Sequence, residues 1–256
     1  MQNLTVAVVQ QEIIPNNPQQ NLATFSRALS NLKNCDLIAL PEVFTTGFCA
    51  NARNFAEYVD GTAYTWMADH AKQLSAVITG SLVVKEGDTY FNRMVWMRPD
   101  GTYTHYDKRH LFRMGGEHTR YQCGTERIIV EVKGWRVLPL VCYDLRFPVW
   151  SRNRDDYDMA IYVANWPSAR ALHWNRLLQA RAIENQAYVV GVNRVGMDEV
   201  HQHYVGDSAI YGPAGEVIVH SQEPGSFFAE LYGDKLQEYR EKFPAYMDAD
   251  DFELKI

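Results

Sequence analysis

Residues 158–193 read DMAIYVANWPSARALHWNRLLQARAIENQAYVVGVN and hold the most informative pattern in the chain. Residues 158–166 and 187–193 are nearly continuous apolar runs, which are typical of strands buried on both faces. Between them, residues 171–185 repeat apolar side chains near helical spacing. A strand, a helix and a strand in this order make a crossover unit, whose two strands must be parallel. The segment therefore predicts an α/β protein.

The N-terminal part of the chain has the same order of elements. Residues 4–9 (LTVAVV) have the pattern of a strand. Asn17 can cap a helix and Pro18 can occupy its first position, so a helix is expected after this strand. Residues 36–40 (DLIAL) predict a second buried strand, and residues 63–74 predict a second helix.

Strand patterns dominate the remainder of the chain. The expected strands are 76–84, 89–97, a run after the turn at 99–101, the hairpin 128–132 with 135–143, a last hairpin made by 203–213 and 216–220, and a closing strand at 227–231. A polar helix is expected from Asp234 to Phe243. No linker or low-complexity segment interrupts the chain, so we expect one domain over 1–256, with two layers of sheet, outer helices, and a C-terminal helix and tail from about 233.

The composition argues against several classes of protein. The 256 residues include 25 Lys and Arg against 31 Asp and Glu, and this net charge of −6 does not suit a protein that binds nucleic acid through a basic surface. The apolar runs are well short of the ~18 residues that span a membrane, so no span is expected. The N-terminal MQNLTVAVVQQ lacks the basic region of a secretory signal, which predicts a cytoplasmic protein.

Metal and nucleotide sites are not indicated either. The four cysteines lie far apart without a CxxC pair, which argues against a disulfide framework and a zinc or redox site. His201 and His203 form the only close histidine pair, without convincing ligand spacing, so we expect them on a hairpin surface. Gly115-Gly116 and residues 212–215 match no phosphate-binding motif. We therefore expect no metal and no cofactor.

Three reactive side chains stand directly beyond apolar strands, where open α/β sheets form ligand crevices. They are Glu42, Lys108 and Cys142. Each has a structural alternative: Glu42 as a helix cap or ion-pair partner, Lys108 in a solvated charge cluster, and Cys142 as a buried core thiol. Taken singly, each residue is weak evidence for catalysis.

Taken together, the segments around these residues resemble a known family. LPEVFTTGF at 40–48, YDKRHLF at 106–112 and VCYDLRFP at 141–148 are similar, in residues and in order, to the three motifs of the nitrilase or carbon-nitrogen hydrolase superfamily. The similarity extends over nearly the whole chain. It implies a four-layer αββα sandwich, and within the superfamily the sequence looks most like the omega-amidases, which hydrolyse 2-oxoglutaramate and 2-oxosuccinamate.

The resemblance also implies roles for individual residues. Glu42 would be the general base, Cys142 the nucleophile that forms a thioester, and Lys108 an oxyanion donor together with the backbone N–H of Tyr143. Glu117 resembles the family's second glutamate, which holds the lysine or positions the amide; its alternative is an exposed loop carboxylate.

The expected contacts with substrate are less specific. Candidates for the pocket wall or a carboxylate clamp are Phe44, Phe112, Arg113, Trp166 and Arg170. We expect Arg146 to make a structural ion pair below the site rather than to touch substrate.

Alternatives to an omega-amidase remain open at this point. They are an amidase for N-carbamoyl compounds or deaminated peptide amides, a true nitrilase, a Cys-His protease arrangement, and a binding module without catalysis. The expected partner is a small-molecule amide. The family tends to dimerise, so a homodimer is expected, to which Phe243, Tyr246 and Phe252 of the tail are candidates to contribute.

Overall fold

The parallel crossover unit predicted from residues 158–193 is present in the computed structural model, which describes residues 1–254. Strand β9 (Met159–Val163), helix α4 (Ala171–Asn185) and strand β10 (Tyr188–Val192) follow one another. The two strands are parallel, with Tyr188 beside Met159 and Val192 beside Val163. Helix α4 buries Trp174, Leu178 and Ala182, so its apolar stripe covers the sheet.

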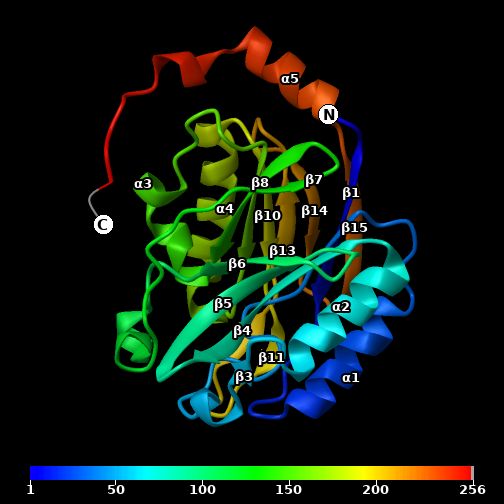
Figure 1. Cartoon of the computed structure of the whole chain (residues 1–256). Coiled ribbons are helices and arrows are strands. Elements are labelled where there is room, and N and C mark those ends of the chain that lie inside the picture. Colours follow the sequence, from blue (N-terminus) through cyan, green and yellow to red (C-terminus); the bar gives the residue numbers. More distant parts are fainter. Residues whose placement is uncertain (255–256) are drawn as a thin grey trace.

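Two mixed β-sheets form the centre of the molecule (Figure 1). The first has the order β15-β1-β2-β4-β5-β6, with β3 also paired to β4. Its strands are β1 (Leu4–Gln10), β2 (Leu37–Ala39), β3 (Glu57–Tyr58), β4 (Val77–Glu86), β5 (Thr89–Met97), β6 (Tyr103–Asp107) and β15 (Gly225–Leu231). The second has the order β14-β13-β10-β9-β8-β7, with β7 (Val130–Val132), β8 (Trp135–Val141), β13 (Ser208–Tyr211) and β14 (Val217–Ser221).

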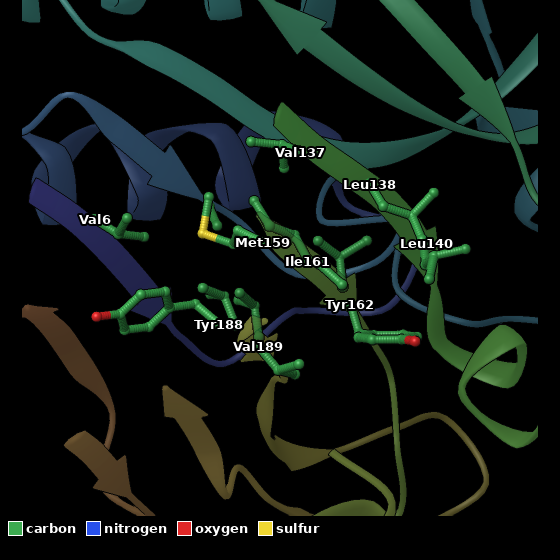
Figure 2. Close-up of a cluster of buried hydrophobic side chains, with 14 of the residues drawn as sticks. Val6, Val137, Leu138, Leu140, Met159, Ile161, Tyr162, Tyr188 and Val189 are labelled. Atoms are coloured by element: carbon green, nitrogen blue, oxygen red, sulfur yellow. The ribbon is translucent and has the colours of Figure 1, made fainter. Parts of the chain in front are cut away.

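The two sheets pack face to face through one continuous core. Figure 2 shows Val6 of β1 on the side of the second sheet toward which Met159 of β9 and Tyr188 of β10 point. Most of these strands belong to parallel pairs with both faces covered, which explains why they are apolar throughout rather than alternating. This core holds the two sheets in one position relative to each other.

Helices cover the outer faces of both sheets. Helices α1 (Pro18–Leu29) and α2 (Thr62–Leu74) lie on the first sheet, with Phe25 and Met67 in a separate apolar cluster. Helix α4 covers the second sheet, with the short α3 (Pro148–Ser151) nearby (Figure 1). The layers are therefore helix, sheet, sheet and helix, and the expected four-layer αββα sandwich is confirmed.

One predicted element is wrong. The run 203–213 does not enter the last hairpin as one piece, because β12 (His203–Val205) pairs with β11 (Val195–Met197) in a separate two-stranded sheet, and β13 starts only at Ser208. Gly206 and Asp207 between them have φ of 74° and 58°, in the left-handed region. A Cβ on Gly206 would lie 2.4 Å from the buried Gln10 amide, so a side chain here would displace that amide as well as strain the backbone.

The first and last strands of the chain pair with each other in the first sheet. Strand β15 runs antiparallel to β1, from Leu4 beside Leu231 to Gln10 beside Gly225. Helix α5 (Gly233–Lys242) follows β15 near the N-terminus, and the tail then passes over the second sheet's helices (Figure 1). Among residues 1–254, no helix is both long and apolar enough to cross a bilayer.

Candidate active site

The topology brings four strand ends to one edge of the sandwich. Strands β2 and β6 of the first sheet run in the same direction, and so do β8 and β9 of the second. Glu42 and Lys108 follow the first pair, and Cys142 and Asn165 follow the second. A hydrogen bond of 2.7 Å from the Asn165 N–H to Glu42 Oε2 joins the two sheets at this edge.

Cys142 occupies a strained turn at the end of β8. Its φ is 45°, in the left-handed region that non-glycine residues occupy at a cost of about 1–3 kcal/mol. The buried Asp144 carboxylate holds this turn, because its Oδ2 accepts from the Val141 N–H at 3.0 Å and its Oδ1 accepts from the His110 N–H at 2.9 Å. The turn is therefore tied to the segment that carries Lys108.

Glu42 is fully buried, and each of its oxygens has protein donors. Oε1 accepts from Lys108 Nζ and from Asn92 Nδ2, both at 2.8 Å, and Oε2 accepts from the Asn165 N–H. A buried carboxylate costs several kcal/mol unless it is paired and hydrogen-bonded, and these donors meet that cost. The helix-cap alternative for Glu42 is wrong, because its partners lie on β5, after β6 and after β9.

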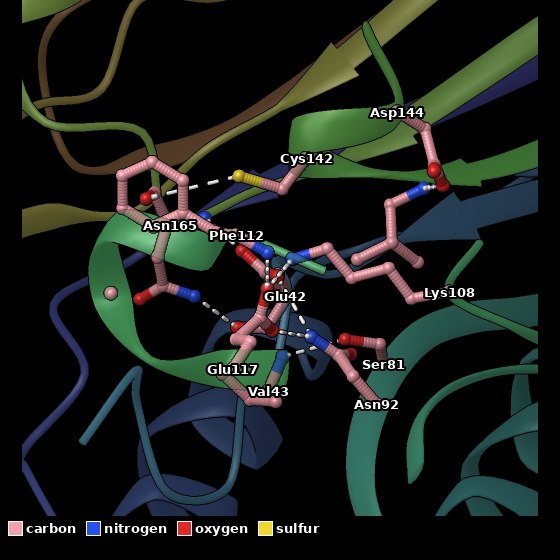
Figure 3. A network of polar contacts seen from close by, with 12 residues as sticks. Glu42, Val43, Ser81, Asn92, Lys108, Phe112, Glu117, Cys142, Asp144 and Asn165 are labelled. Atoms are coloured by element: carbon pink, nitrogen blue, oxygen red, sulfur yellow. Dashed lines mark hydrogen bonds and ion pairs between the residues drawn. The ribbon is translucent and has the colours of Figure 1, made fainter. Parts of the chain in front are cut away.

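Lys108 lies between two carboxylates rather than in a solvated cluster (Figure 3). Its Nζ donates to Glu42 Oε1 and to Glu117 Oε2, both at 2.8 Å. Glu117 is fully buried and also accepts from the Phe112 N–H at 2.6 Å, so the exposed-loop alternative for it is wrong. An ammonium has three N–H donors, and two are used here, which leaves one for a further acceptor.

The charges of this cluster keep the cysteine protonated at rest. Burial and the negative charge of Glu42 raise the pKa of the Cys142 thiol well above its usual value, and Lys108 offsets only part of this. Burial opposes the charged form of Lys108, but Glu117 and Glu42 outweigh it and raise the pKa of its ammonium well above the usual value. Lys108 alone favours the thiolate, but burial and the two carboxylates that surround its ammonium outweigh this effect.

Two asparagines of the network were not predicted. Asn92 Nδ2 donates to both Glu42 Oε1 and Glu117 Oε1, at 2.8 and 3.3 Å, and Asn165 Nδ2 donates to the Glu42 carbonyl at 2.6 Å. Asn165 follows the apolar strand β9, as Glu42 follows β2, so its strand-end position was a signal that could have found it. Asn92 lies inside β5, where no strand-end signal exists.

A pocket of about 430 Å³ opens above Cys142, Glu42 and Lys108. Phe112, Tyr143, Trp166 and Arg170 line it, as do Phe48, Arg146, Asn165, Pro167, Gln202 and Tyr204, which were not expected there. A concave site lined by aromatic side chains and a few polar groups suits a small ligand.

Three expectations about the pocket wall need correction. Phe44 is fully buried against Phe25 and Trp66, because its side chain enters the helix-facing core rather than the pocket. Arg113 is exposed in the loop after Phe112 and does not line the pocket. Arg146 does line it, and its guanidinium contacts His173 at 3.0 Å instead of a carboxylate.

The structure offers no metal-binding cluster within residues 1–254, since no group of three or more His, Cys, Asp or Glu side chains gathers there at ligand distances. All four cysteines are free thiols. His201 and His203 are exposed, but Gln202 between them reaches the pocket rim. The chemistry available at the site is thus that of one thiol, two carboxylates and one ammonium.

Comparison with known proteins accounts for this arrangement. The profile of the family described as carbon-nitrogen hydrolase matches residues 5–240. The chain belongs to the carbon-nitrogen hydrolase family. Curated relatives include "Omega-amidase YafV" of Escherichia coli K12, 50% identical over 99% of this chain and 100% of that protein, and "2-oxoglutaramate amidase" of Bacillus subtilis, 32% identical over 95% and 96%.

A solved structure of this family is similar throughout. The carbon-nitrogen hydrolase superfamily protein XC1258 of Xanthomonas campestris, described with an arsenic adduct in its active site, is 44% identical. It superposes with a TM-score of 0.98 over 100% of both chains. The sandwich described above is therefore the fold of carbon-nitrogen hydrolases.

Proposed function

We propose that this carbon-nitrogen hydrolase is an omega-amidase, which hydrolyses the terminal amide of 2-oxoglutaramate and related 2-oxo acid amides to the 2-oxo acid and ammonia. The carrying observation is the meeting of Cys142, Glu42 and Lys108 in one small pocket, in a chain 50% identical to an omega-amidase over nearly its full length. The second relative, a 2-oxoglutaramate amidase, covers 95% of the chain and points to the same substrate class.

In the proposed mechanism Cys142 is the nucleophile and Glu42 is the general base. The thiol is protonated at rest, so Glu42 takes its proton as sulfur attacks the amide carbon. This requires a carboxylate that stays ionised beside the thiol, and Lys108 and Asn92 supply the donors that favour that form of Glu42.

The tetrahedral oxyanion then needs donors that are already in position. The N–H of Lys108 that is not used by Glu42 or Glu117 is one, and the backbone N–H of Tyr143 is the other. Preorganised donors of this kind are typically worth about 3 kcal/mol each. Glu117 positions Lys108 through its 2.8 Å contact, and it fixes the adjacent loop through the Phe112 N–H.

Glu42 next returns the proton to the leaving nitrogen, so the carbon–nitrogen bond breaks and ammonia departs. The thioester on Cys142 remains. Glu42 deprotonates a water molecule that attacks this thioester. When the carbon–sulfur bond breaks, Glu42 returns this proton to the sulfur, which gives the acid, the free thiol and the ionised carboxylate again. One carboxylate thus serves twice as base and twice as acid.

The test is ammonia release from 2-oxoglutaramate and, in parallel, from glutamine. We expect release from the oxo acid amide, with Cys142→Ala inactive and Arg176→Gln, on the exposed side of α4, unchanged. Absence of release from 2-oxoglutaramate by folded protein would reject the substrate class, and N-carbamoyl and peptide amides would be tested next.

We further propose that the protein works as a homodimer in the cytoplasm. Phe243 and Tyr246 of the tail are 59% and 38% exposed, which favours a partner surface, whereas Phe252 stacks under Arg154 of its own chain at 4.3 Å. Four free thiols fit a reducing compartment. Light scattering after size exclusion tests the first proposal, with a monomer as the contrary result, and cell fractionation tests the second.

A further inference from the structure

The pocket wall carries more positively charged than negatively charged side chains. Among its lining side chains, Lys108, Arg146 and Arg170 are cationic and Glu42 is the only carboxylate. Glu42 and Lys108 satisfy each other at the floor of the pocket, at 2.8 Å. The charge that remains for a ligand therefore comes from the two arginines.

Both guanidinium groups stand over aromatic walls of the pocket. Arg146 Cζ lies 4.8 Å from the ring centre of Trp166, and Arg170 Cζ lies 5.5 Å from that of Phe112. The Trp166 indole also donates to the Arg170 carbonyl at 2.8 Å, which ties the ring under Arg146 to the backbone of Arg170. Stacking on a ring holds a guanidinium in place while leaving its N–H edge available.

Neither arginine has an acidic partner in the part of the chain that the structure describes. The arginine ion pairs within residues 1–254 belong to Arg93, Arg127, Arg136, Arg181 and Arg240. Arg146 contacts His173 Nδ1, and Arg170 makes only its stacking contact through the side chain. Two guanidinium groups without an acidic partner beside one pocket are suited to bind a planar anion such as a carboxylate.

We infer that Arg146 and Arg170 together form the subsite that binds the α-carboxylate of the substrate and so determine specificity for anionic amides. This inference rests on the proposed function and names the residues that select its substrate. In 2-oxoglutaramate the carboxylate is four bonds from the amide carbon, so an amide placed at Cys142 directs the carboxylate toward the wall. The same cations oppose an α-ammonium group, and the wall offers it no free carboxylate, which disfavours glutamine.

The test uses a probe that cannot be hydrolysed. 2-Oxopentanoate keeps the carboxylate and the oxo group of the substrate and lacks the amide, and 2-pentanone lacks both the amide and the carboxylate. Each is measured as a protectant of Cys142 against iodoacetamide, with the modified peptide identified by mass. The proteins are wild type, Arg146→Gln, Arg170→Gln and the matched control Arg176→Gln, which lies on the exposed face of α4.

We expect 2-oxopentanoate to protect wild type and Arg176→Gln equally, and 2-pentanone to protect neither. Each pocket variant should need at least about tenfold more 2-oxopentanoate, because it loses a charged hydrogen bond. Arg→Lys at either position should restore part of the protection, since the charge returns without the planar fork.

Unchanged protection in either glutamine variant would overturn the two-arginine subsite, and so would equal protection by 2-pentanone. The outcome is separable from that of the proposed function. Protection that depends on both arginines without hydrolysis of 2-oxoglutaramate would reject the function and keep the anion subsite. Hydrolysis of 2-oxoglutaramate, with protection that is independent of the arginines, would keep the proposed function and reject the two-arginine subsite.

Discussion

At the scale of single residues, the reactivity of Cys142 is controlled by its neighbour Glu42. The thiol is partly open to the pocket, yet burial and the carboxylate keep its pKa well above the usual value. In the proposed mechanism the thiol loses its proton only to Glu42 during attack, so the resting thiol is protected from adventitious oxidation, because the thiolate is the reactive form.

Replacing Glu42 separates its effect on the pKa of Cys142 from its proposed role as general base. Glu42→Gln removes a negative charge that raises the pKa of Cys142, so the pH profile of iodoacetamide labelling at Cys142 should move to lower pH. Ammonia release should fall by about 10²–10⁴-fold, because the proposed general base is lost. Cys123, which is half-buried, serves as the internal reference for labelling. A labelling profile that stays where it is in wild type would contradict this account of the thiol.

The unpredicted Asn92 provides a second test at this scale. Asn92→Leu removes the donor shared by Glu42 and Glu117 and places an apolar group beside two buried carboxylates. We expect the free energy of unfolding to fall by about 1.5–3 kcal/mol for the lost charged hydrogen bond, and kcat to fall with it. Urea unfolding and steady-state kinetics measure both. Asn92→Asp, which adds a third negative charge, should be the more harmful variant, and the opposite order would refute the electrostatic explanation.

At the scale of elements, the strand-end turns are held in register by Asp144. Its carboxylate accepts from the Val141 N–H, the His110 N–H, His110 Nδ1 and the Tyr106 hydroxyl, so it links the end of β8 to the segment that follows β6. The turn after β8 carries Cys142, the proposed nucleophile, and the segment after β6 carries Lys108. Asp144 is a positioning residue, since it does not line the pocket.

Asp144→Asn replaces one acceptor oxygen by a donor that faces N–H groups. We expect kcat to fall more than KM rises, because the alignment of Cys142 and Lys108 suffers while the pocket wall remains. The control is Tyr106→Phe, which removes one of the four contacts and should have a smaller effect. A purely structural role would instead lower the active fraction and leave kcat per active site, from titration of Cys142, within twofold of wild type.

Helix α5 is docked by an acid-sensitive contact. Arg240 donates to Asp158 Oδ1 at 3.1 Å and to the carbonyls of Gln186 and Tyr157 at 2.9 Å each. Burial alone would raise the pKa of Asp158, but Arg136 and Arg240 hold it below the usual value. A depressed carboxyl pKa contributes stability that is present at neutral pH and is lost as the pH falls through the folded-state value.

Arg240→Gln should therefore be less stable than wild type at neutral pH, and this difference should shrink as the pH falls below about 4. Urea unfolding over the pH range measures the difference, and protease resistance of the C-terminal segment reports on α5 itself. Lys242→Gln, on an exposed pair with Glu238, is the control and should have little effect. A difference in stability that is independent of pH would contradict the role of Asp158.

At the scale of the whole molecule, the two sheets depend on one another. The inner core contains side chains from both, and β1 is flanked by β15 from the other end of the chain. Helices α1 and α2 pack on the first sheet in a separate cluster, but the inner face of each sheet is covered by the other sheet. We therefore propose that residues 1–256 form a single cooperative domain.

Leu140→Ala tests this cooperativity. Leu140 is fully buried on the side of the second sheet that faces helix α4, and truncation should cost about 2–5 kcal/mol of unfolding free energy. Far-ultraviolet circular dichroism and tryptophan fluorescence should shift together, because Trp96 and Trp135 report on different sheets within the same core. Separate transitions in wild type or variant would show two units. Leu172→Ala, at an exposed position of α4, is the control.

Local sequence patterns were sufficient for most elements and for the reactive residues. Helix α4 and the Asn17 cap of α1 follow from periodicity and capping chemistry, which act over a few residues. Glu42 and Cys142 stood out because each follows an apolar strand and lies in a recognisable motif, whereas Lys108 follows the polar strand β6 and was singled out mainly by its motif. Phe44 was misplaced because a motif position does not specify on which side of a loop the side chain lies.

The sequence by itself determined the strand and helix order, the parallel crossover units and the set of reactive groups, because these depend on local periodicity and on residue chemistry. Only the tertiary structure decided that β15 pairs with β1, that the β11–β12 hairpin brings Gln202 to the pocket, and that Arg146 faces the ligand rather than a carboxylate. It also decided the protonation state of Cys142, since that depends on which charges surround the thiol. Such contacts join residues far apart in the chain, and a local pattern carries no information about which distant partner lies beside it.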